Sequence, residues 1–254
     1  MSKSKKKEGS KEEVVINLDN LGVPIAIIVS GIIIATVIFF ASKNVTSVKT
    51  PSEDKQEDSI AQDDYIPEET GEGVALLEDG AFIGNPDTAT VAVIEYSDYF
   101  CGFCQRHFNE TFPSIKEKYV DTGDVLYVFK KFPLSNPGEL GFDVAEGSVC
   151  TYKLSDADTF LKFHEKAFSL SSKDQIVELA VELGVDEDDF TTCFNGNTYR
   201  ENVKSMLEEG RDMGISGTPG FLVGAIKDDG TVEGELIFGA YPFETFADTI
   251  EAFL

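Results

Sequence analysis

The sequence is poor in basic residues, and this excludes one large class of partner. Its 254 residues include 21 Lys and Arg against 46 Asp and Glu, for a formal net charge of −25. Such a chain repels a phosphate backbone, and proteins that bind nucleic acid usually carry basic patches. We therefore expect no nucleic-acid partner. An acidic surface also opposes self-association, so we expect a monomer.

Tryptophan is absent, and the first 100 residues contain no cysteine. The hydrophobic fraction of 42% and the 20 Phe residues are still enough to build a core, so the composition is that of a globular protein. All four cysteines lie in the second part of the chain, at Cys101, Cys104, Cys150 and Cys193. An even number in a domain outside the cytoplasm suggests disulfides, and four cysteines allow three full pairings.

Charged side chains are also missing from residues 21–41. As an α-helix this run would be about 31 Å long, which matches the roughly 30 Å hydrocarbon core of a bilayer. Lysines precede the run, and positive residues stay in the cytoplasm. We expect a cytoplasmic tail over 1–20, a single transmembrane helix over 21–41, and a domain that lies outside the cytoplasm, periplasmic or extracellular.

Other interpretations of this run are less favoured. A cleaved signal peptide has a shorter apolar stretch of about 7–15 residues and a small-residue cleavage site, whereas this run ends in Phe39, Phe40 and Ala41. No cysteine follows closely enough for a lipid anchor. A buried core helix is the remaining alternative, although the run has no polar face.

After the run, residues 42–72 are acidic, rich in Ser, Thr and Gln, and without apolar periodicity, which predicts a disordered linker. The folded domain is expected over 73–254. A strand over 88–96, a helix over 101–119 and a strand over 125–132 predict a βαβ unit with parallel strands.

The pattern then changes to short amphipathic helices and returns to strands near the end of the chain. Gly184 and Gly214 stand where helices end, and the run from Asp228 to Gly230 is typical of a hairpin turn. The helices are expected over 142–153, 156–170, 173–183, 186–194 and 198–213, the strands over 221–223 and 235–238, and a last helix over 241–254. We therefore predict an α/β fold whose sheet is split by a helical insertion over about 140–213.

The strongest chemical motif is Cys101-Gly-Phe-Cys104, at the junction of a predicted strand and a predicted helix. Free N–H groups at a helix N-terminus favour negative charge, which lowers the pKa of a thiol below about 8.5. The two sulfurs lie one turn apart and can form a small disulfide ring. The motif therefore predicts thiol–disulfide exchange through a mixed disulfide.

Two alternatives to a redox pair remain. With His107 the motif gives C-x2-C-x2-H, a partial zinc pattern, but no fourth ligand lies nearby and structural zinc usually uses a second paired motif. The other alternative is a purely structural disulfide. We expect no metal and no cofactor, with His107 on the surface and His164 packed or capping in the insertion.

Three runs of sequence carry a family resemblance: GNPD at 84–87, VIEYSDYFCGFC at 93–104 and GISGTPGF at 214–221. Together they resemble the DsbA-like branch of the thioredoxin superfamily over about 73–254. The resemblance implies a thioredoxin-like fold with a helical insertion. The dipeptide between the cysteines departs from the best-known oxidase of the family, because it has no His and no Pro, which leaves the oxidising strength open.

The resemblance also implies roles for individual residues. Cys101 matches the nucleophile and Cys104 its buried partner, and Pro219 matches a cis-proline beside the disulfide, which leaves Thr218 to pair with a substrate strand. Glu95 matches a buried acid that relays a proton to Cys104; alternatively it is an ordinary strand residue facing solvent. The remaining two cysteines commonly face each other in this family, so the expected structural disulfide joins Cys150 and Cys193.

These features lead to a membrane-anchored thiol–disulfide oxidoreductase as the main hypothesis. As a dithiol oxidase it would act on unfolded or reduced secreted proteins and need a quinone-linked partner in the membrane, DsbB-like or VKOR-like. A reductase or isomerase is the enzymatic alternative, although no dimerisation segment is evident. A non-catalytic module that binds peptides or a metal is the alternative from another class.

Overall fold

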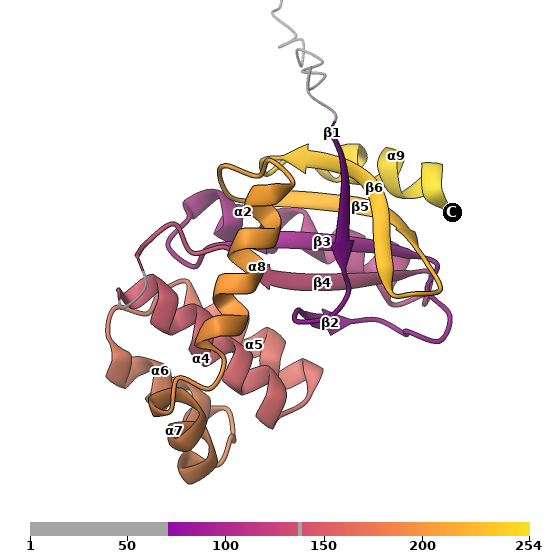
Figure 1. Ribbon diagram of the computed structural model, residues 1–254. Helices are drawn as coiled ribbons and strands as arrows, with labels where there is room; N and C mark the ends of the chain where they lie inside the picture. Colours follow the sequence, from indigo (N-terminus) through magenta and orange to yellow (C-terminus); the bar gives the residue numbers. More distant parts are fainter. Residues whose placement is uncertain (1–70, 137–138) are drawn as a thin grey trace, which may run out of the picture. The chain divides into compact units, whose positions relative to one another are not determined.

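The computed structural model describes residues 71–136 and 139–254, which form a six-stranded sheet with helices on both faces (Figure 1). The predicted cytoplasmic tail, transmembrane helix and most of the acidic linker lie outside the described residues. Within these two ranges no helix is long and apolar enough to cross a membrane. The first strand begins at Gly71, slightly before the expected domain start at residue 73.

The sheet has the order β1-β6-β5-β3-β4-β2, and only β3 and β4 are parallel neighbours. The expected βαβ unit is thus present, and the strands that follow the insertion complete the same sheet beside β3. The strands are β1 (Gly71–Leu76), β2 (Ala81–Ile83), β3 (Val91–Ser97), β4 (Val125–Lys131), β5 (Gly220–Ile226) and β6 (Thr231–Phe238).

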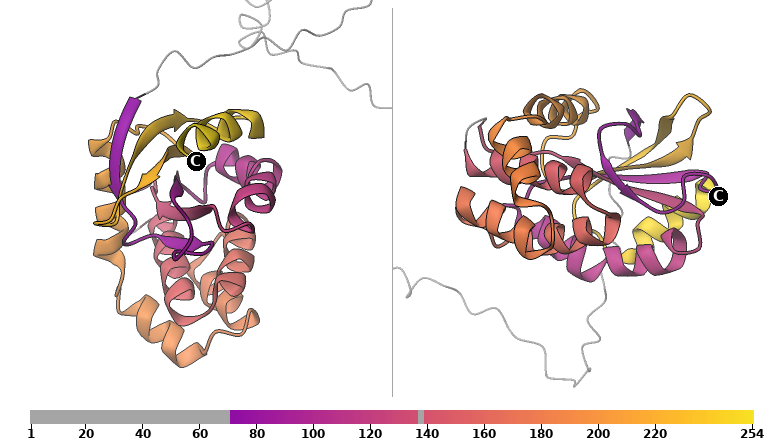
Figure 2. Two further views of the ribbon diagram at one scale, coloured as in Figure 1. Left: turned by 90° about the vertical axis from the view of Figure 1, so that its right-hand side faces the viewer. Right: turned by 90° about the horizontal axis from the view of Figure 1, so that it is seen from below.

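Side chains alternate along the central strands and so build two separate apolar layers. Val93 on β3 and Phe129 on β4 face one layer, which the first helices after β3 and the last helix of the chain cover. Ile94 and Val128 face the other layer, which the last insertion helix covers. The two views of Figure 2 show these helices on opposite sides of the sheet. The helices on the first face are α2 (Gly102–Glu110), α3 (Phe112–Ile115) and α9 (Phe243–Phe253), and α8 (Arg200–Asp212) lies on the second.

The single helix expected over 101–119 is wrong, because the chain makes three pieces there. The helix α2 ends at Glu110, α3 begins at Phe112, and a π-helical turn, η3 (Lys116–Val120), follows. Pro113 explains the break, since proline has no N–H to continue the hydrogen-bond ladder but is well tolerated in the first turn of a new helix. The active-site helix is therefore short.

Four helices of the insertion precede α8, at positions close to those expected. Gly184 and Gly214 follow helix ends with φ of +93° and +90°, a backbone conformation that glycine adopts at little cost. Cys150 of the first helix is joined to Cys193 of the fourth by a disulfide, the pair that the family resemblance implies. The four helices are α4 (Leu140–Leu154), α5 (Ala157–Ala167), α6 (Lys173–Glu182) and α7 (Glu187–Asn195).

Two buried carboxylates hold the insertion helices together through one arginine. Asp143 and Glu146 of α4 have fully buried side chains. Arg200 of α8 reaches both, with 2.7 Å from Nη2 to Asp143 Oδ1 and 2.7 Å from Nε to Glu146 Oε2. Lys173 of α6 adds an exposed contact of 2.9 Å to Asp143. This cluster connects α4, α6 and α8.

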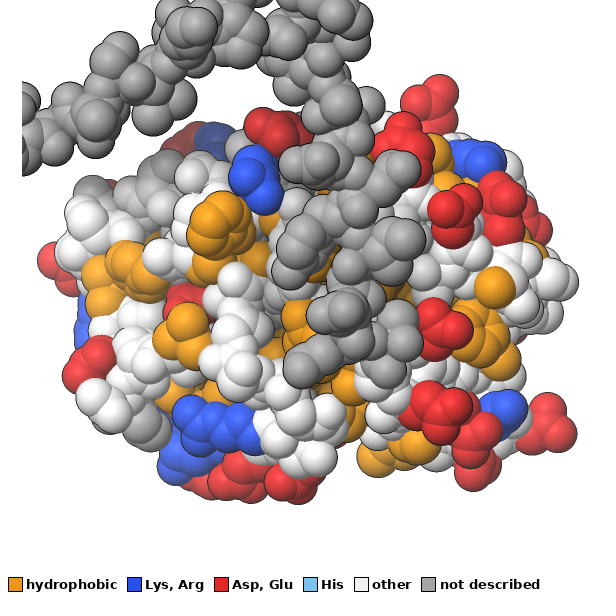
Figure 3. Space-filling model, turned by 90° about the horizontal axis from the view of Figure 1, so that it is seen from above, with side chains coloured by type: hydrophobic (Ala, Val, Ile, Leu, Met, Phe, Trp, Pro, Cys, Tyr) orange, Lys and Arg blue, Asp and Glu red, His pale blue; other side chains and the backbone are white. Residues whose placement is uncertain are grey.

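The described surface carries the acidic character of the sequence. In the face shown in Figure 3, acidic side chains are scattered over the described part, and basic side chains occur only in places. Several lysines on the described surface are paired with carboxylates, among them Lys116 with Asp121 and Lys166 with Glu182. These lysines therefore lie beside opposite charges.

Candidate active site

Cys101 is the N-cap of α2 and follows the short loop after β3, which ends at Ser97. Its backbone is extended, with φ −98° and ψ 114°, so the chain turns from strand to helix at this residue. The cap has no side-chain hydrogen bond. The half-buried sulfur of Cys101 therefore lies at the positive end of a helix with free N–H groups near it. Both Cys101 and Cys104 are free thiols in this structure.

The electrostatics of the site separate the two thiols. The hydrogen bond from Cys104 is the largest of the influences that lower the pKa of Cys101 to about 5, and Thr218 and the N–H groups of Phe103 and Cys104 add to it, against burial. Burial raises the pKa of Cys104 far above its ordinary value, and the hydrogen bond to Cys101 and the charge of Glu95 act in the same direction. Cys101 is thus the thiolate, and Cys104 keeps its proton.

The low pKa of Cys101 predicts how the alkylation rate of the reduced protein depends on pH. Iodoacetamide reacts with thiolates, so the rate at Cys101 should stay nearly constant from about pH 6 to 8 and fall only as the pH drops through about 5. The alkylation rate of an ordinary cysteine, with a pKa of about 8.5, would instead rise steadily between about pH 6 and 8. Mass-mapped alkylation rates against pH check this, and a midpoint near 8.5 would contradict it.

The loop before β5 completes the site from far along the chain. The Thr218–Pro219 peptide bond is cis. When Cys101 is protonated, its thiol donates a hydrogen bond to the carbonyl oxygen of Thr218, with 3.2 Å between Sγ and the oxygen. This contact arises because β5 lies beside β3 in the sheet, which brings the start of β5 to the end of β3. The structure therefore unites Cys101, Cys104, Thr218 and Pro219.

Glu95 is fully buried on β3, on the face that α2 covers, so it does not face solvent as in the alternative interpretation. Its Oε2 accepts a hydrogen bond of 2.8 Å from the hydroxyl of Tyr127 on β4. Burial raises the pKa of Glu95 to about 7, while the hydrogen bond from Tyr127, the hydroxyl of Ser97 and the charge of Lys131 act against the shift. A carboxyl with such a pKa can both take and give a proton near neutral pH.

The expectation for His107 is wrong, because this side chain is buried rather than on the surface. Its exposed fraction is 1%, and its Nε2 lies 2.9 Å from the hydroxyl oxygen of Tyr127. The rings of Phe221 and Phe246 pack against it at centroid distances of 4.5 and 5.1 Å. Burial lowers the pKa of His107 to about 3, so the imidazole is neutral.

A second cluster of buried polar side chains lies around the hydroxyl of Tyr99, which belongs to the loop before Cys101. Lys131 Nζ donates to this oxygen at 3.2 Å, Ser148 of α4 lies 2.7 Å away, and His164 Nδ1 of α5 lies 2.9 Å away. Burial lowers the pKa of Lys131 to about 7, against the effect of Glu95. His164 packs in the insertion as expected, and the group ties the active-site loop to the insertion helices.

Sequence reasoning missed Tyr127 and Lys131, although one signal was available. Glu95 pairs with Phe129 in the parallel register of β3 and β4. Residues two apart on a strand share a face, so Tyr127 and Lys131 flank Phe129 on the same face as Glu95. Two lysines, Lys130 and Lys131, end a strand that is otherwise apolar, which is unusual because a buried amine needs a partner. That pattern could have identified both residues.

The zinc alternative does not fit the geometry, because His107 directs its ring to Tyr127 in the core. In the part of the chain that the structure describes, no three His, Cys, Asp or Glu side chains form a group that could hold a metal ion. The site contains instead two thiols of different acidity, a buried carboxyl and a backbone carbonyl, which is a set of groups for sulfur exchange and proton transfer.

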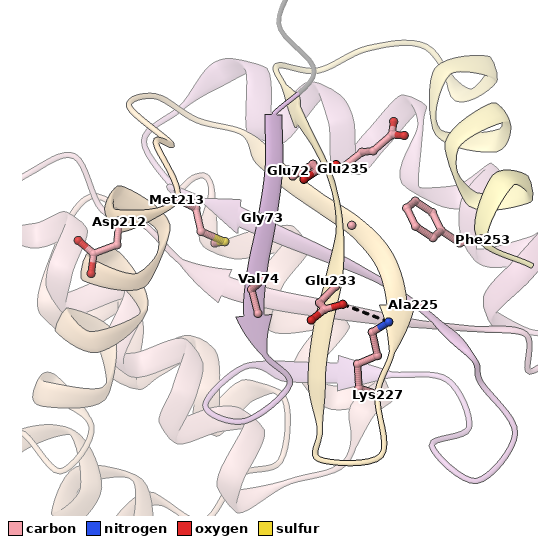
Figure 4. Close-up of a pocket in the computed structure, with 11 residues that line it drawn as sticks. Glu72, Gly73, Val74, Asp212, Met213, Ala225, Lys227, Glu233, Glu235 and Phe253 are labelled. Atoms are coloured by element: carbon pink, nitrogen blue, oxygen red, sulfur yellow. Dashed lines mark ion pairs between the residues drawn. The ribbon is translucent and has the colours of Figure 1, made fainter.

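A separate pocket of about 910 Å³ lies over β1, β6 and the end of α8, away from the cysteines. Figure 4 shows acidic side chains around it, with the ion pair of Lys227 and Glu233 at 3.1 Å on one wall. Glu72, Glu235 and Asp212 contribute to the lining. No residue of the dithiol site lines this pocket, so we assign it no part in the chemistry.

The buried side chain of Asp98 fixes the backbone of two exposed apolar residues near the dithiol. Phe100, Phe103 and Leu134 are more than half exposed. Asp98 fixes two of them through the backbone: its Oδ1 accepts from the N–H of Phe100 and its Oδ2 from the N–H of Leu134, both at 2.9 Å. Two exposed phenylalanines therefore flank Cys101 in the sequence, and Leu134 is tied to the same loop through Asp98.

The fold and the site together define a thioredoxin-fold dithiol protein with a helical insertion. A family model described as "Thioredoxin" matches residues 77–235, and the chain belongs to this family. Solved structures show the same architecture. BdbD of Bacillus subtilis in its oxidised form aligns with a TM-score of 0.60 at 23% identity, over 72% of this chain and 97% of that one. Alpha-DsbA1 of Wolbachia pipientis aligns with a TM-score of 0.58 at 25% identity, over 69% and 90%.

Curated relatives carry names related to disulfide formation. Disulfide bond formation protein D of Bacillus subtilis (strain 168) is 30% identical over 146 residues, which are 54% of this chain and 64% of that protein. A probable disulfide bond formation protein D of Bacillus anthracis is 26% identical over 148 residues, 54% of this chain and 66% of that protein. The match thus spans slightly less than two thirds of the length of these relatives.

Proposed function

We propose that this protein is a thiol–disulfide oxidoreductase that acts as a dithiol oxidase outside the cytoplasm. The observation that carries the proposal is the contrast between the acidic Cys101 thiol at the start of α2 and the buried Cys104 thiol. A stabilised thiolate favours the reduced enzyme, so its disulfide is a better oxidant. The names of the curated relatives support the same reaction.

The reaction begins with the oxidised Cys101–Cys104 pair. A substrate thiolate attacks Cys101 Sγ, a mixed disulfide forms, and the sulfur of Cys104 leaves as a thiolate that takes a proton from Glu95. A second substrate thiolate attacks the substrate sulfur of the mixed disulfide and releases the Cys101 thiolate. Two electrons pass from the substrate dithiol to the enzyme. The product is a substrate disulfide and a reduced enzyme.

The surroundings of Cys101 favour unfolded, reduced polypeptides as substrates. Side chains of Phe103, Arg106, Phe238 and Tyr241 line a pocket of about 240 Å³ next to Thr218, large enough for one apolar side chain. An extended chain there can also pair with the backbone of Thr218. Chains that have not yet folded expose apolar side chains and backbone groups without hydrogen-bond partners. Newly secreted proteins are therefore the proposed substrate class.

A turnover leaves the dithiol reduced, so the proposal includes a reoxidising partner. We infer a quinone-linked membrane protein, DsbB-like or VKOR-like, that removes two electrons from Cys101 and Cys104. The charge-free run at 21–41 would hold the domain near such a partner, with the N-terminus in the cytoplasm. Monomeric action fits this scheme, because one dithiol is sufficient for oxidation.

Equilibration of the domain with glutathione redox buffers tests the direction of the reaction. We expect a reduction potential near about −120 mV, typical of strong oxidants, and oxidation of a reduced model peptide that contains two cysteines. A value near about −270 mV would support a reductase instead. Metal release on oxidation, without peptide oxidation, would support a metal-binding module.

A further inference from the structure

A chain of hydrogen bonds runs from Glu95 into the core. The hydroxyl of Tyr127 on β4 lies 2.8 Å from Glu95 Oε2, and Nε2 of His107 on α2 lies 2.9 Å from the same hydroxyl. Glu95 and Tyr127 are fully buried and His107 is 1% exposed. Three side chains from three elements thus form a continuous polar line inside an apolar layer, on the side of the sheet that carries Cys104.

The proton positions in this line follow from counting donors. Tyr127 has one hydroxyl proton, which it donates in the hydrogen bond to Glu95, so its oxygen must accept a hydrogen bond from the N–H of His107. The ring proton of the neutral imidazole then lies on Nε2, and Nδ1 has no hydrogen-bond partner. His107 therefore fixes the direction of the Tyr127 hydroxyl, and Tyr127 delivers a hydrogen bond to the charged form of Glu95.

We infer that Tyr127 and His107 are positioning residues that keep Glu95 able to accept the proton of Cys104. The inference rests on the proposed dithiol exchange. It goes beyond that exchange because it assigns a part in the reaction to Tyr127 and His107, whose hydrogen bonds in this line do not reach either sulfur. A hydrogen bond to a carboxylate favours its ionised form. Without that bond, the desolvated carboxyl would keep a proton at neutral pH.

The step that depends on this bond is the closure of the Cys101–Cys104 disulfide. In the presence of glutathione disulfide, the Cys101 thiolate first displaces one glutathione thiolate and forms a mixed disulfide. The Cys104 thiol then gives its proton to Glu95, and its sulfur attacks Cys101 Sγ. The S–S bond of the enzyme forms, and the second glutathione leaves as a thiolate. Two electrons pass from the dithiol to glutathione disulfide.

Other titratable groups face this line and stay in place in the variants. The thiols of Cys101 and Cys104 and the amine of Lys131 influence the charge on Glu95. The phenol of Tyr99 responds to Glu95, and His164 responds to both His107 and Lys131. A change in pH dependence that appears only when the line is broken therefore comes from the lost hydrogen bond.

The experiment is acid-quenched mass spectrometry of the reduced domain during reaction with glutathione disulfide, over about pH 4.5–9. In Tyr127→Phe we expect the acid limb of ring closure to move up by about one pH unit, so that closure slows about tenfold at pH 6 and the glutathione adduct accumulates. His107→Phe should shift the limb in the same direction by less. Adduct formation, which depends on the Cys101 thiolate, should keep its pH profile in both.

Tyr96→Phe is the matched control. Tyr96 is also a buried sheet tyrosine that donates to a glutamate, Glu209 at 2.8 Å, but it faces the opposite layer. Its pH profile should equal that of the wild type. The inference is overturned if closure in Tyr127→Phe keeps the wild-type profile, or, should that variant not fold, if His107→Phe does. A wild-type protein that forms no adduct would instead refute the proposed exchange itself.

Discussion

The substitution Cys101→Ala is expected to abolish thiol–disulfide exchange while leaving the fold intact. Cys101 is half-buried at the N-cap of α2 and makes no capping bond through its side chain, so alanine removes little packing. Within the described residues, it does remove the only cysteine sulfur that is both accessible and ionised at neutral pH. We expect the rate of peptide oxidation to fall on the order of 10³-fold or more, towards the uncatalysed background. Peptide oxidation and far-UV circular dichroism check the two parts.

Cys104→Ala is the matched comparison, because it also prevents the disulfide but keeps the nucleophile. This variant should react once with glutathione disulfide and then stop as a mixed disulfide, since the sulfur that closes the ring is missing. The adduct should be visible as a stable mass increase on Cys101. Substantial turnover by Cys101→Ala, or an adduct on any cysteine other than Cys101 in Cys104→Ala, would contradict the assignment of roles.

Arg200→Met is expected to destabilise the insertion more than any surface substitution in the described chain. Arg200 is 14% exposed and pairs with two fully buried carboxylates, Asp143 and Glu146. Removing the cation leaves two like charges without a buried partner, a change that typically costs about 3–5 kcal/mol. Burial already raises the pKa of Glu146, against the charge of Arg200. The loss should therefore be larger at pH 7 than at pH 4, where the Glu146 carboxyl can protonate.

Lys173→Met provides the control for this cluster. Lys173 contacts the same Asp143, but its side chain is 59% exposed, so solvent screens the pair. We expect a loss below about 1 kcal/mol, with little dependence on pH. Urea unfolding at both pH values measures the two free energies of unfolding. Equal losses in Arg200→Met and Lys173→Met would show that the buried carboxylates do not depend on the arginine.

Most helices and the central strands could be predicted, because each carries a strong local pattern. The run at 125–132 is rich in β-branched and aromatic residues, and the insertion helices have caps and apolar stripes. The strands β1 and β2 were not predicted. β1 contains two glycines and β2 has three residues, so neither shows a periodicity, and both form through pairing with distant strands.

For the site, the sequence identified the groups whose chemistry is local. Cys101 and Cys104 are recognisable from their spacing and from the strand and helix on either side. His107 illustrates what could not be predicted: it lies on the same helix, and only the packing of α9 and β5 over it decides that it is buried. Burial depends on which elements meet in space, and that information lies outside any local window of sequence.

The contact between Cys101 and the Thr218 carbonyl joins residues 117 positions apart, with the whole insertion between them. At a synthesis rate of about 5–20 residues per second, roughly 6–23 s pass between the appearance of the two residues on the ribosome. During that interval the nascent chain carries a pair of thiols that lacks its finished surroundings. The surroundings of the dithiol are therefore completed late in the synthesis of this chain.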